Sequence, residues 1–410
     1  MPDTDHPRVA SLYVHVPFCA RKCEYCAFYS EAARGEVVAD YVVALVRELE
    51  LVAADLQPRT VFFGGGTPSL LTLQQWEQIL LAVQRLDLLG AGEWTVECNP
   101  ATVSAEKARL LRAHGVNRVS LGVQSLDGAL LDRLGRVHTR EQVFKSFDLL
   151  RQAGFANLNV DLMFGIPGQT MARWRETLGE ALALGSEHLS CYEVIYEEDT
   201  PLFEQLRAGQ FDVDEDLACA MYEELVERAA AAGFQQYEVA NFARPTRRGT
   251  EAPAEAEEVT PGGPRSNPSA QPAAIPALAC QHNVNYWRGG AFYGLGPSAT
   301  SYVRGVRTKN WSNTGLYCEQ LACGSRPVES REALAPLSRA GETAAFGLRL
   351  VAGWPFEEFQ RATRFDLRAH WRGEMERLVE KGWGHWAPDR FRLTRQGLRF
   401  ADAAAELFLR

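Results

Sequence analysis

The chain has 410 residues, and its 52 acidic and 43 basic side chains give a formal net charge of −9. This length predicts two or three domains with a substantial core, while the acidic balance argues against nonspecific nucleic-acid binding. Because the sequence shows no secretory leader pattern and no apolar run long enough for a transmembrane segment, we expect a soluble, cytoplasmic protein with reduced cysteines.

Six apolar segments in the first half of the chain alternate with helical patterns. Strands separated by helices predict βα units and a parallel sheet. We therefore expect an α/β fold built on an open or partial (β/α)6 barrel. The expected strands are Ser11–Phe18, Thr60–Gly66, Trp94–Asn99, Arg118–Gln124, Asn157–Gly165 and His188–Ile195, and the expected helices are Val38–Ala54, Leu73–Arg85, Ser104–His114, Glu141–Ala153 and Met171–Leu184.

Composition divides the chain into four parts. Residues 1–243 hold the barrel core and a following helical region, whereas residues 244–279 are rich in Pro, Ala and Glu and predict a disordered surface insertion. Residues 280–328 begin with the segment His-Asn-Val-Asn-Tyr-Trp and continue in loops near the barrel mouth. Residues 329–410 predict a small, mainly helical C-terminal domain with a winged-helix-like pattern. DNA binding would rest on fold analogy alone, so packing on the barrel or docking a partner is favoured.

Three cysteines crowd one short loop after the first expected strand, namely Cys19, Cys23 and Cys26 at C-x3-C-x2-C spacing. Three such thiolates can each hold one iron of a cubane [4Fe–4S] cluster and leave the fourth iron without a protein ligand. Zinc is the competing interpretation, but structural zinc sites usually have four ligands and the only nearby imidazoles are His6 and His15. The ligand count favours the cluster.

Polar or glycine residues stand at the carboxyl ends of successive expected strands, where the reactive groups of parallel α/β barrels belong. Since these ends meet at one edge of the sheet, we expect a single pocket there. The glycine run lacks the Lys-Ser/Thr of a phosphate-binding loop, so it does not indicate nucleotide phosphates; it lets backbone groups approach a ligand closely. The residues concerned are Cys19, Gly64 to Thr67, Glu97, Gln124 and Asp161.

The segment Tyr13 to Phe18, followed by the cysteine triad, resembles the radical S-adenosylmethionine (SAM) superfamily. Within it the chain resembles the group that contains oxygen-independent coproporphyrinogen III oxidases and HemW-type heme chaperones. The resemblance implies that SAM chelates the open iron and that an electron, from a donor such as a flavodoxin or ferredoxin, allows its cleavage. The positions that match SAM contacts are Tyr13, Tyr25, Gly65, Gly66, Thr67, Glu97, Gln124, Arg136 and Asp161.

Two features separate the branches of this group. The oxidases carry a further cysteine two residues beyond the triad, where this chain has Phe28. The segment from His282 to Trp287 matches the H-N-x-x-Y-W motif that is associated with heme binding in the chaperone branch. Imidazole is a normal axial ligand of heme iron, so the resemblance makes His282 the candidate ligand. Without the resemblance, we would interpret His282 as a hydrogen-bonded packing residue.

Two functions remain open from the sequence. The first is a heme chaperone that binds heme, a [4Fe–4S] cluster and SAM and transfers heme to an acceptor protein. The alternative is an oxygen-independent coproporphyrinogen III oxidase, or another enzyme that acts on a tetrapyrrole. Phe28 and the segment around His282 favour the first. Whether SAM is cleaved, and hence whether the chain is an enzyme, is left open.

Overall fold

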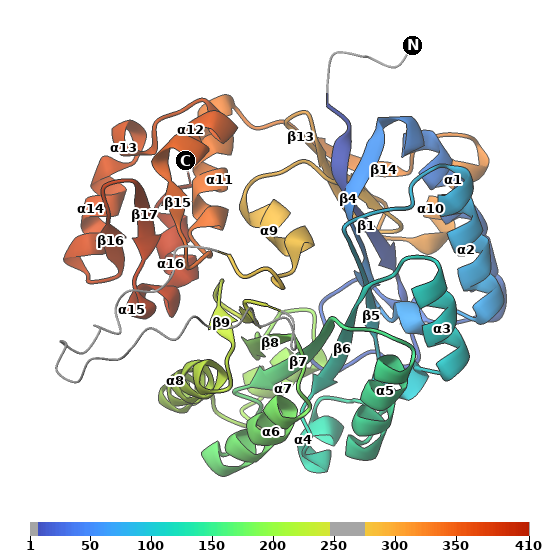
Figure 1. The fold of residues 1–410 in the computed structure, drawn as a ribbon, viewed down its shortest axis with the longest axis horizontal. Coiled ribbons are helices and arrows are strands. Elements are labelled where there is room, and N and C mark those ends of the chain that lie inside the picture. The colour runs from blue at the N-terminus through green and yellow to red at the C-terminus, as the bar shows by residue number, and fades with distance from the viewer. Residues whose placement is uncertain (1–6, 247–274, 410) are drawn as a thin grey trace, which may run out of the picture.

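One large curved sheet dominates the computed structural model, which describes residues 7–246 and 275–409 (Figure 1). Its nine strands follow the order β11-β1-β4-β5-β6-β7-β8-β10-β9; all neighbours up to β8 pair in parallel, and the last two strands are antiparallel. Because the edge strands β11 and β9 do not pair with each other, the barrel is open, which confirms the predicted fold class. The strands are β1 (Val9–Val16), β4 (Leu56–Gly65), β5 (Glu93–Cys98), β6 (Arg118–Gln124), β7 (Leu158–Phe164), β8 (His188–Glu193), β9 (Gln235–Gln236), β10 (Asn241–Ala243) and β11 (Tyr293–Leu295).

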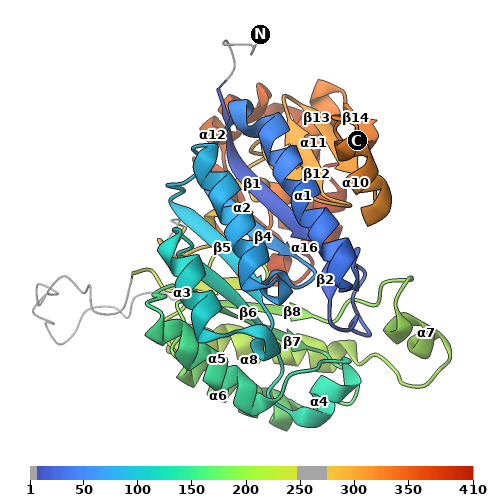
Figure 2. The same ribbon diagram turned by 90° about the vertical axis from the view of Figure 1, so that its right-hand side faces the viewer.

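Helices cover the convex face of this sheet (Figure 2). Sharp local signals fix their ends: Thr72 and Gln75 form a capping box at the start of α2, and Thr139 with Gln142 does the same for α5. The helices are α1 (Gly35–Val52), α2 (Leu73–Arg85), α3 (Ala105–Ala113), α4 (Gly128–Arg133), α5 (Arg140–Gln152), α6 (Met171–Ala183), α7 (Pro201–Arg207) and α8 (Glu215–Ala231). Five of these helices, α1, α2, α3, α5 and α6, lie within a few residues of the predicted ranges, whereas α4, α7 and α8 match no predicted range.

The two faces of the parallel strands differ in character because successive side chains point to opposite sides. Val14, Phe63 and Val96 belong to the main hydrophobic core under the helices. The alternate positions carry polar groups instead, and Ser120 and Asn159 on the concave face are buried and hydrogen-bonded to each other. Parallel strands are usually apolar on both faces. A polar concave face therefore marks the inside of the barrel as a functional region.

The segment 280–328 differs from the expected barrel-mouth loops. It contains helix α9 (Gln281–Trp287), strand β11 beside β1 in the main sheet, and most of a separate antiparallel sheet with the order β12-β13-β14. A three-residue strand is too short for a periodicity signal, so the sequence pattern missed β11. The remaining elements are β12 (Thr300–Val303), β13 (Val306–Asn310), α10 (Thr314–Ala322) and β14 (Val328–Glu332).

The C-terminal unit has a hydrophobic core of its own, which includes Trp354, Trp371 and Phe391. It begins at Pro336, after β14, rather than at residue 329 as expected, because β14 pairs with β13 in the preceding sheet. The unit is mainly helical, with a small antiparallel sheet of the order β15-β17-β16. Its elements are α11 (Pro336–Gly347), β15 (Trp354–Pro355), α12 (Phe356–Thr363), α13 (Leu367–His370), α14 (Arg372–Glu380), β16 (Gly384–Trp386), β17 (Arg390–Leu393), α15 (Arg395–Leu398) and α16 (Ala401–Glu406).

The predicted insertion at 244–279 falls mostly outside the described residues, which stop at 246 and resume at 275. Its predicted end is wrong, since Leu278 and Ala279 are buried in a cluster with Tyr237 and Leu350.

Among the helices of the two described ranges, none is both long and apolar enough to cross a membrane.

Candidate functional site

The cysteine loop lies directly against the glycine loop that follows β4. The backbone N–H of Gly66 donates to the carbonyl oxygen of Val16 at 2.8 Å, and that of Thr67 donates to Phe18 at 2.8 Å. The Thr67 hydroxyl also approaches Cys19 Sγ at 3.6 Å. These bonds join two segments about 50 residues apart in the chain and fix the cysteines at the carboxyl edge of the sheet.

The three cysteines suit a cluster with a positively charged neighbour. All three thiols are partly exposed, and Arg136 Nη1 lies 3.4 Å from Cys23 Sγ. Burial raises the pKa of the Cys19 and Cys26 thiols, while the Thr67 hydroxyl lowers the pKa of Cys19. In the described part of the chain, no three Cys, His, Asp or Glu side chains converge on a single-ion site. A cubane instead places each thiolate on a different iron.

Glycine is required in the loop after β4 for two separate reasons. Gly65 has φ +101°, a left-handed conformation that side-chain-bearing residues rarely adopt, and a Cβ there would overlap the His15 ring at 2.4 Å. A Cβ on Gly66 would lie 2.7 Å from the carbonyl oxygen of Phe18. Any larger residue at these positions would push the glycine loop away from the cysteine loop.

A cavity of about 550 Å³ opens beside the cysteines and runs down the inside of the barrel. Its volume is typical of a small-molecule pocket. Tyr13 is the one predicted SAM contact that does not line it, because its hydroxyl turns aside to His15 Nδ1 at 3.0 Å. The predicted residues that do line the cavity are Cys19, Cys23, Cys26, Tyr25, Gly65, Gly66, Thr67, Glu97, Gln124, Arg136 and Asp161.

Two partly buried carboxyl groups, those of Glu97 and Asp161, face this cavity. Burial, together with the charge of Asp161, raises the pKa of Glu97 to about 8, although the Gly65 N–H donates to Glu97 Oε2 at 3.2 Å. Burial also raises the pKa of Asp161, against hydrogen bonds from Ser120 at 2.9 Å and Asn159 at 2.7 Å. A cation placed between the two carboxyl groups would stabilise their ionised forms.

Gln124 ends β6 in a strained conformation. Its φ of 65° is unusual for a residue with a side chain, and the register of β6 against β7 shifts at this point. The Tyr192 hydroxyl donates to Gln124 Oε1 at 2.9 Å and holds the side chain over the cavity. The bulge thereby turns Gln124 toward the site instead of continuing the strand.

A continuous hydrogen-bond chain leads from Asp161 to the start of α9. Asn159 Nδ2 donates to Asp161, and Asn159 Oδ1 pairs with His188 Nδ1 at 2.6 Å. His188 Nε2 lies 2.8 Å from the hydroxyl of Tyr237, which accepts the backbone N–H of Cys280 at 3.2 Å. Burial lowers the pKa of His188 well below its ordinary value, so the ring is neutral and the bonds share one direction.

Helix α9 is fixed against the barrel at its start. The Glu93 carboxylate accepts the backbone N–H groups of Gln281 at 2.9 Å and His282 at 3.0 Å. His282 is 1% exposed, with Nδ1 3.0 Å from Thr60 Oγ1 and Nε2 2.8 Å from the Tyr286 hydroxyl. Burial and the Arg118 charge lower the pKa of His282 to about 3, so its ring is neutral.

The other residues of the His282–Trp287 segment face different neighbours. Asn283 lines the cavity, whereas His282 does not. The Trp287 ring lies 6.4 Å from that of Phe346 in α11 and is covered by the Arg349 guanidinium at 5.1 Å. Figure 1 shows α9 between the sheet and the C-terminal helices, in agreement with its contacts to β4 and α11. The segment therefore joins the cavity to the C-terminal unit.

The mouth of the cavity carries exposed apolar side chains next to basic ones. Phe28 is 69% exposed and Ile195 is 66% exposed, and both line the cavity with the exposed Arg21 and Lys22. Large exposed apolar side chains at a cavity mouth indicate contact with another molecule.

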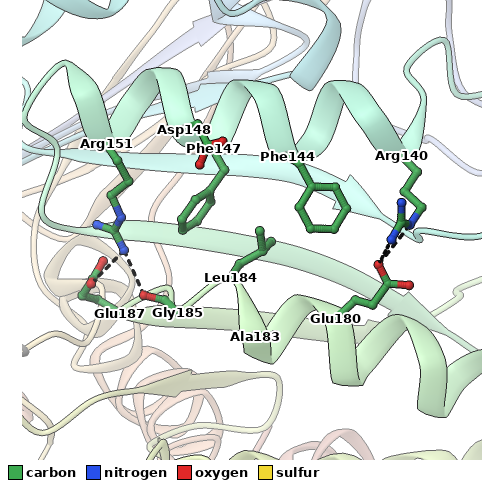
Figure 3. Close-up of a pocket in the computed structure, with 10 residues that line it drawn as sticks. All are labelled: Arg140, Phe144, Phe147, Asp148, Arg151, Glu180, Ala183, Leu184, Gly185 and Glu187. Carbon is green, nitrogen blue, oxygen red and sulfur yellow. Dashed lines mark hydrogen bonds and ion pairs between the residues drawn. The ribbon is translucent and has the colours of Figure 1, made fainter.

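A second cavity, of about 600 Å³, lies outside the barrel between α5 and α6. Figure 3 shows that each of its arginines pairs with a glutamate, Arg140 with Glu180 and Arg151 with Glu187. It holds no cysteine and no unpaired cation, so the cavity inside the barrel is the better candidate site.

Sequence reasoning missed several polar residues of the barrel interior. Most of them lie deeper than the strand ends on β6, β7 and β8, where they alternate with apolar residues, whereas Asn241 lies in β10 and Asn283 in α9. That alternation is the signal that could have found Ser120, Asn159 and Ser190, because a buried parallel strand has no other reason for polar positions at period two. The missed residues that line the cavity are Arg118, Ser120, Asn159, Ser190, Tyr192, Asn241 and Asn283.

Comparison with known proteins gives agreeing results. A profile of the radical SAM superfamily matches residues 13–181, and one of the HemN C-terminal domain matches residues 334–400. Curated relatives described as heme chaperone HemW are 32% identical over 408 residues in Bacillus subtilis, covering 97% of this chain and 99% of the relative. The Escherichia coli relative is 32% identical over 411 residues, with coverages of 97% and 98%.

A solved structure matches the whole architecture. Coproporphyrinogen III oxidase (HemN) from Escherichia coli, described as a radical SAM enzyme, superposes with a TM-score of 0.79 and covers 99% of this chain and 91% of its own. The two sequences are 20% identical, so this likeness establishes the fold.

The raised pKa of Glu97 predicts a pH-dependent loss of stability. The Glu97 carboxyl ionises near pH 4.5 in the unfolded chain but only near pH 8 in the folded chain. Its contribution to the free energy of unfolding is therefore fully present below about pH 4.5 and is lost as the pH rises through 8. A tenfold difference between the two acid dissociation constants is worth about 1.4 kcal/mol. Glu97→Gln removes the titration, so its unfolding free energy should fall less than that of the wild type between about pH 5 and 8.

Urea unfolding across this pH range measures the difference. Glu77→Gln, on the exposed face of α2, is the matched control and should keep the wild-type pH profile. Parallel pH profiles for the wild type and Glu97→Gln would show that Glu97 is already ionised in the folded chain.

Proposed function

The chain belongs to the HemW family of the radical SAM superfamily, and we propose that it acts as a heme chaperone, which binds heme and passes it to an acceptor protein. The observation that carries this proposal is the sequence identity of 32% to HemW relatives, which extends over 97% of this chain and 98–99% of theirs. That span includes the cysteine loop, α9 and the C-terminal unit. The heme acceptor and an electron donor such as a flavodoxin or ferredoxin are the proposed protein partners.

Within this proposal, Cys19, Cys23 and Cys26 hold a [4Fe–4S] cluster. When bound, the cluster supplies an iron without a protein ligand and an electron for SAM cleavage. The protein's part is positional: hydrogen bonds from Gly66 and Thr67 hold the cysteine loop at the cavity mouth, and Arg136 offsets thiolate charge beside Cys23.

SAM is proposed to occupy the adjacent part of the cavity. Its ammonium group suits the carboxyl of Glu97, its ribose hydroxyls suit Asp161, and Arg136 suits its carboxylate. The positive φ of Gly65 allows the glycine loop to lie close to the ligand. Tyr13 does not line the cavity, and its part in the proposed site is indirect: its ring lies 6.2 Å from that of Phe62, which does line it.

Heme is proposed to bind at α9, with His282 as an axial ligand. The neutral ring is the form of histidine that binds metals. Both ring nitrogens have partners, so Nε2 can reach an iron only by exchanging its 2.8 Å contact with the Tyr286 hydroxyl for the metal. Heme binding therefore requires a local movement of α9 or of Tyr286.

The first prediction concerns the cluster. Replacing Cys19, Cys23 or Cys26 with Ala should abolish the absorption near about 400 nm that is typical of iron–sulfur centres, because Cys98, the other cysteine that lines the cavity, is buried and burial raises the pKa of its thiol to about 12. Iron analysis after anaerobic reconstitution measures the bound iron, which should be about four irons per chain in the wild type and should be lost in each variant. Cys323→Ala, at an exposed thiol, is the control and should keep its cluster. A triple variant that still holds four irons would refute the ligand assignment.

The second prediction concerns heme. His282→Ala should weaken heme binding by roughly tenfold or more, or shift the Soret band, while iron content and SAM binding stay unchanged, since those sites use other residues. Tyr286→Phe removes the competing hydroxyl and should bind heme at least as tightly as the wild type. Spectroscopic heme titration of all three proteins provides the test. Identical spectra and affinities for the wild type and His282→Ala would exclude His282 as the ligand.

A further inference from the structure

The inner end of the barrel cavity contains a buried cation without a counter-ion. Arg118, the first residue of β6, is 2% exposed and lines the cavity. Its one hydrogen bond, from Nη1 to Thr95 Oγ1, is long at 3.5 Å, and its Nε has no acceptor. No carboxylate within the described ranges forms an ion pair with it. Burying an unpaired guanidinium costs several kcal/mol, so such a group needs an anionic partner.

The nearest carboxylates are committed to other donors. Glu93 spends its two oxygens on the backbone N–H groups at the start of α9. Asp161 spends its oxygens on Ser120 and Asn159. Burial works against the charged form of Arg118, while Cys280, Glu93 and Asp161 act on it through space and raise its pKa. The guanidinium is therefore free to bind a ligand from the cavity.

The second cation inside the cavity differs in this respect. Arg136, at the mouth, also has an Nε without an acceptor, but its Nη1 lies 3.4 Å from Cys23 Sγ and its Nη2 donates to the carbonyl oxygen of Gly122 at 2.6 Å. Besides Asp161, the lining of the cavity that contains Arg118 includes the neutral amides of Asn241 and Asn283 and the ring of Phe62. Asn283 belongs to α9, so this inner end of the cavity adjoins the helix that carries His282. A guanidinium among amides and one aromatic ring suits a carboxylate on an otherwise apolar molecule.

We infer that the inner end of the cavity is a carboxylate-binding subsite, in which Arg118 pairs with a carboxylate of the ligand that docks against α9. This inference rests on the proposed function, under which that carboxylate is a propionate of heme. A carboxylate of SAM is the other source with the same chemistry, and the experiment distinguishes the two.

Heme and its dimethyl ester, whose propionates carry no charge, are titrated into the reconstituted full-length wild type, Arg118→Met and Arg118→Lys. The wild type should bind heme about 10- to 100-fold more tightly than the ester. Arg118→Met should lose this preference while its affinity for the ester stays at the wild-type value, and Arg118→Lys should retain part of it. SAM affinity should not change. Arg151→Met, in the outer cavity, is the matched control and should behave as the wild type.

The outcomes separate the subsite from the proposed function. The propionate subsite would be overturned if Arg118→Met still bound heme more tightly than the ester. It would also be overturned if Arg118→Met lost affinity for SAM instead of its preference for heme. If the wild type bound neither heme nor ester, the chaperone proposal would fail, and the subsite would be judged by thermal unfolding with propionate and with uncharged propionamide. Propionate should then raise the unfolding temperature more than propionamide in the wild type only; equal effects would overturn the subsite.

Discussion

The concave face of the parallel sheet buries polar side chains that must satisfy one another, and the rest of the molecule is arranged around this requirement. Asn159 is the central residue: its amide donates to Ser120 and Asp161, and its carbonyl meets His188. Unsatisfied polar groups at this depth would cost about 1–3 kcal/mol each. A network that is complete on one side and open to the cavity on the other gives a rigid pocket with free acceptors.

Helix α9 completes this interior from the open side of the barrel. Its first N–H groups are held by Glu93, and the backbone N–H just before it joins the chain to Asp161 through Tyr237 and His188. At its other end, the guanidinium of Arg288 donates to the carbonyl oxygen of Gly353 at 2.8 Å in the C-terminal unit. One short helix thus contacts the cavity and the C-terminal unit, which suits a protein that must take up a ligand and release it to a partner.

Much of the fold and part of the site followed from local patterns. The strands that carry Glu97 and Asp161, and the bounds of α2, follow from periodicity and capping that neighbouring residues determine, although Asp161 lies in the middle of β7 rather than at its end. Arg118 could not be found this way, because a basic residue at the start of a strand looks solvent-exposed until Cys280 and α9, some 160 residues later, cover it. The contacts of both His282 nitrogens, and β11 beside β1, likewise depend on long-range packing that no local pattern encodes.

Because the fold is shared with an oxidase, the fold cannot separate a heme chaperone from a coproporphyrinogen III oxidase. What happens to the bound tetrapyrrole does separate them. Phe28 and Ile195, exposed at the cavity mouth, offer apolar contacts for a tetrapyrrole in either case. The most direct measurement is mass spectrometry of the tetrapyrrole after anaerobic incubation of the reconstituted chain with SAM, a reductant and either heme or coproporphyrinogen III. We expect that heme is bound and recovered unchanged and that coproporphyrinogen III is not converted. Repeated turnover of coproporphyrinogen III to protoporphyrinogen IX would contradict the chaperone function.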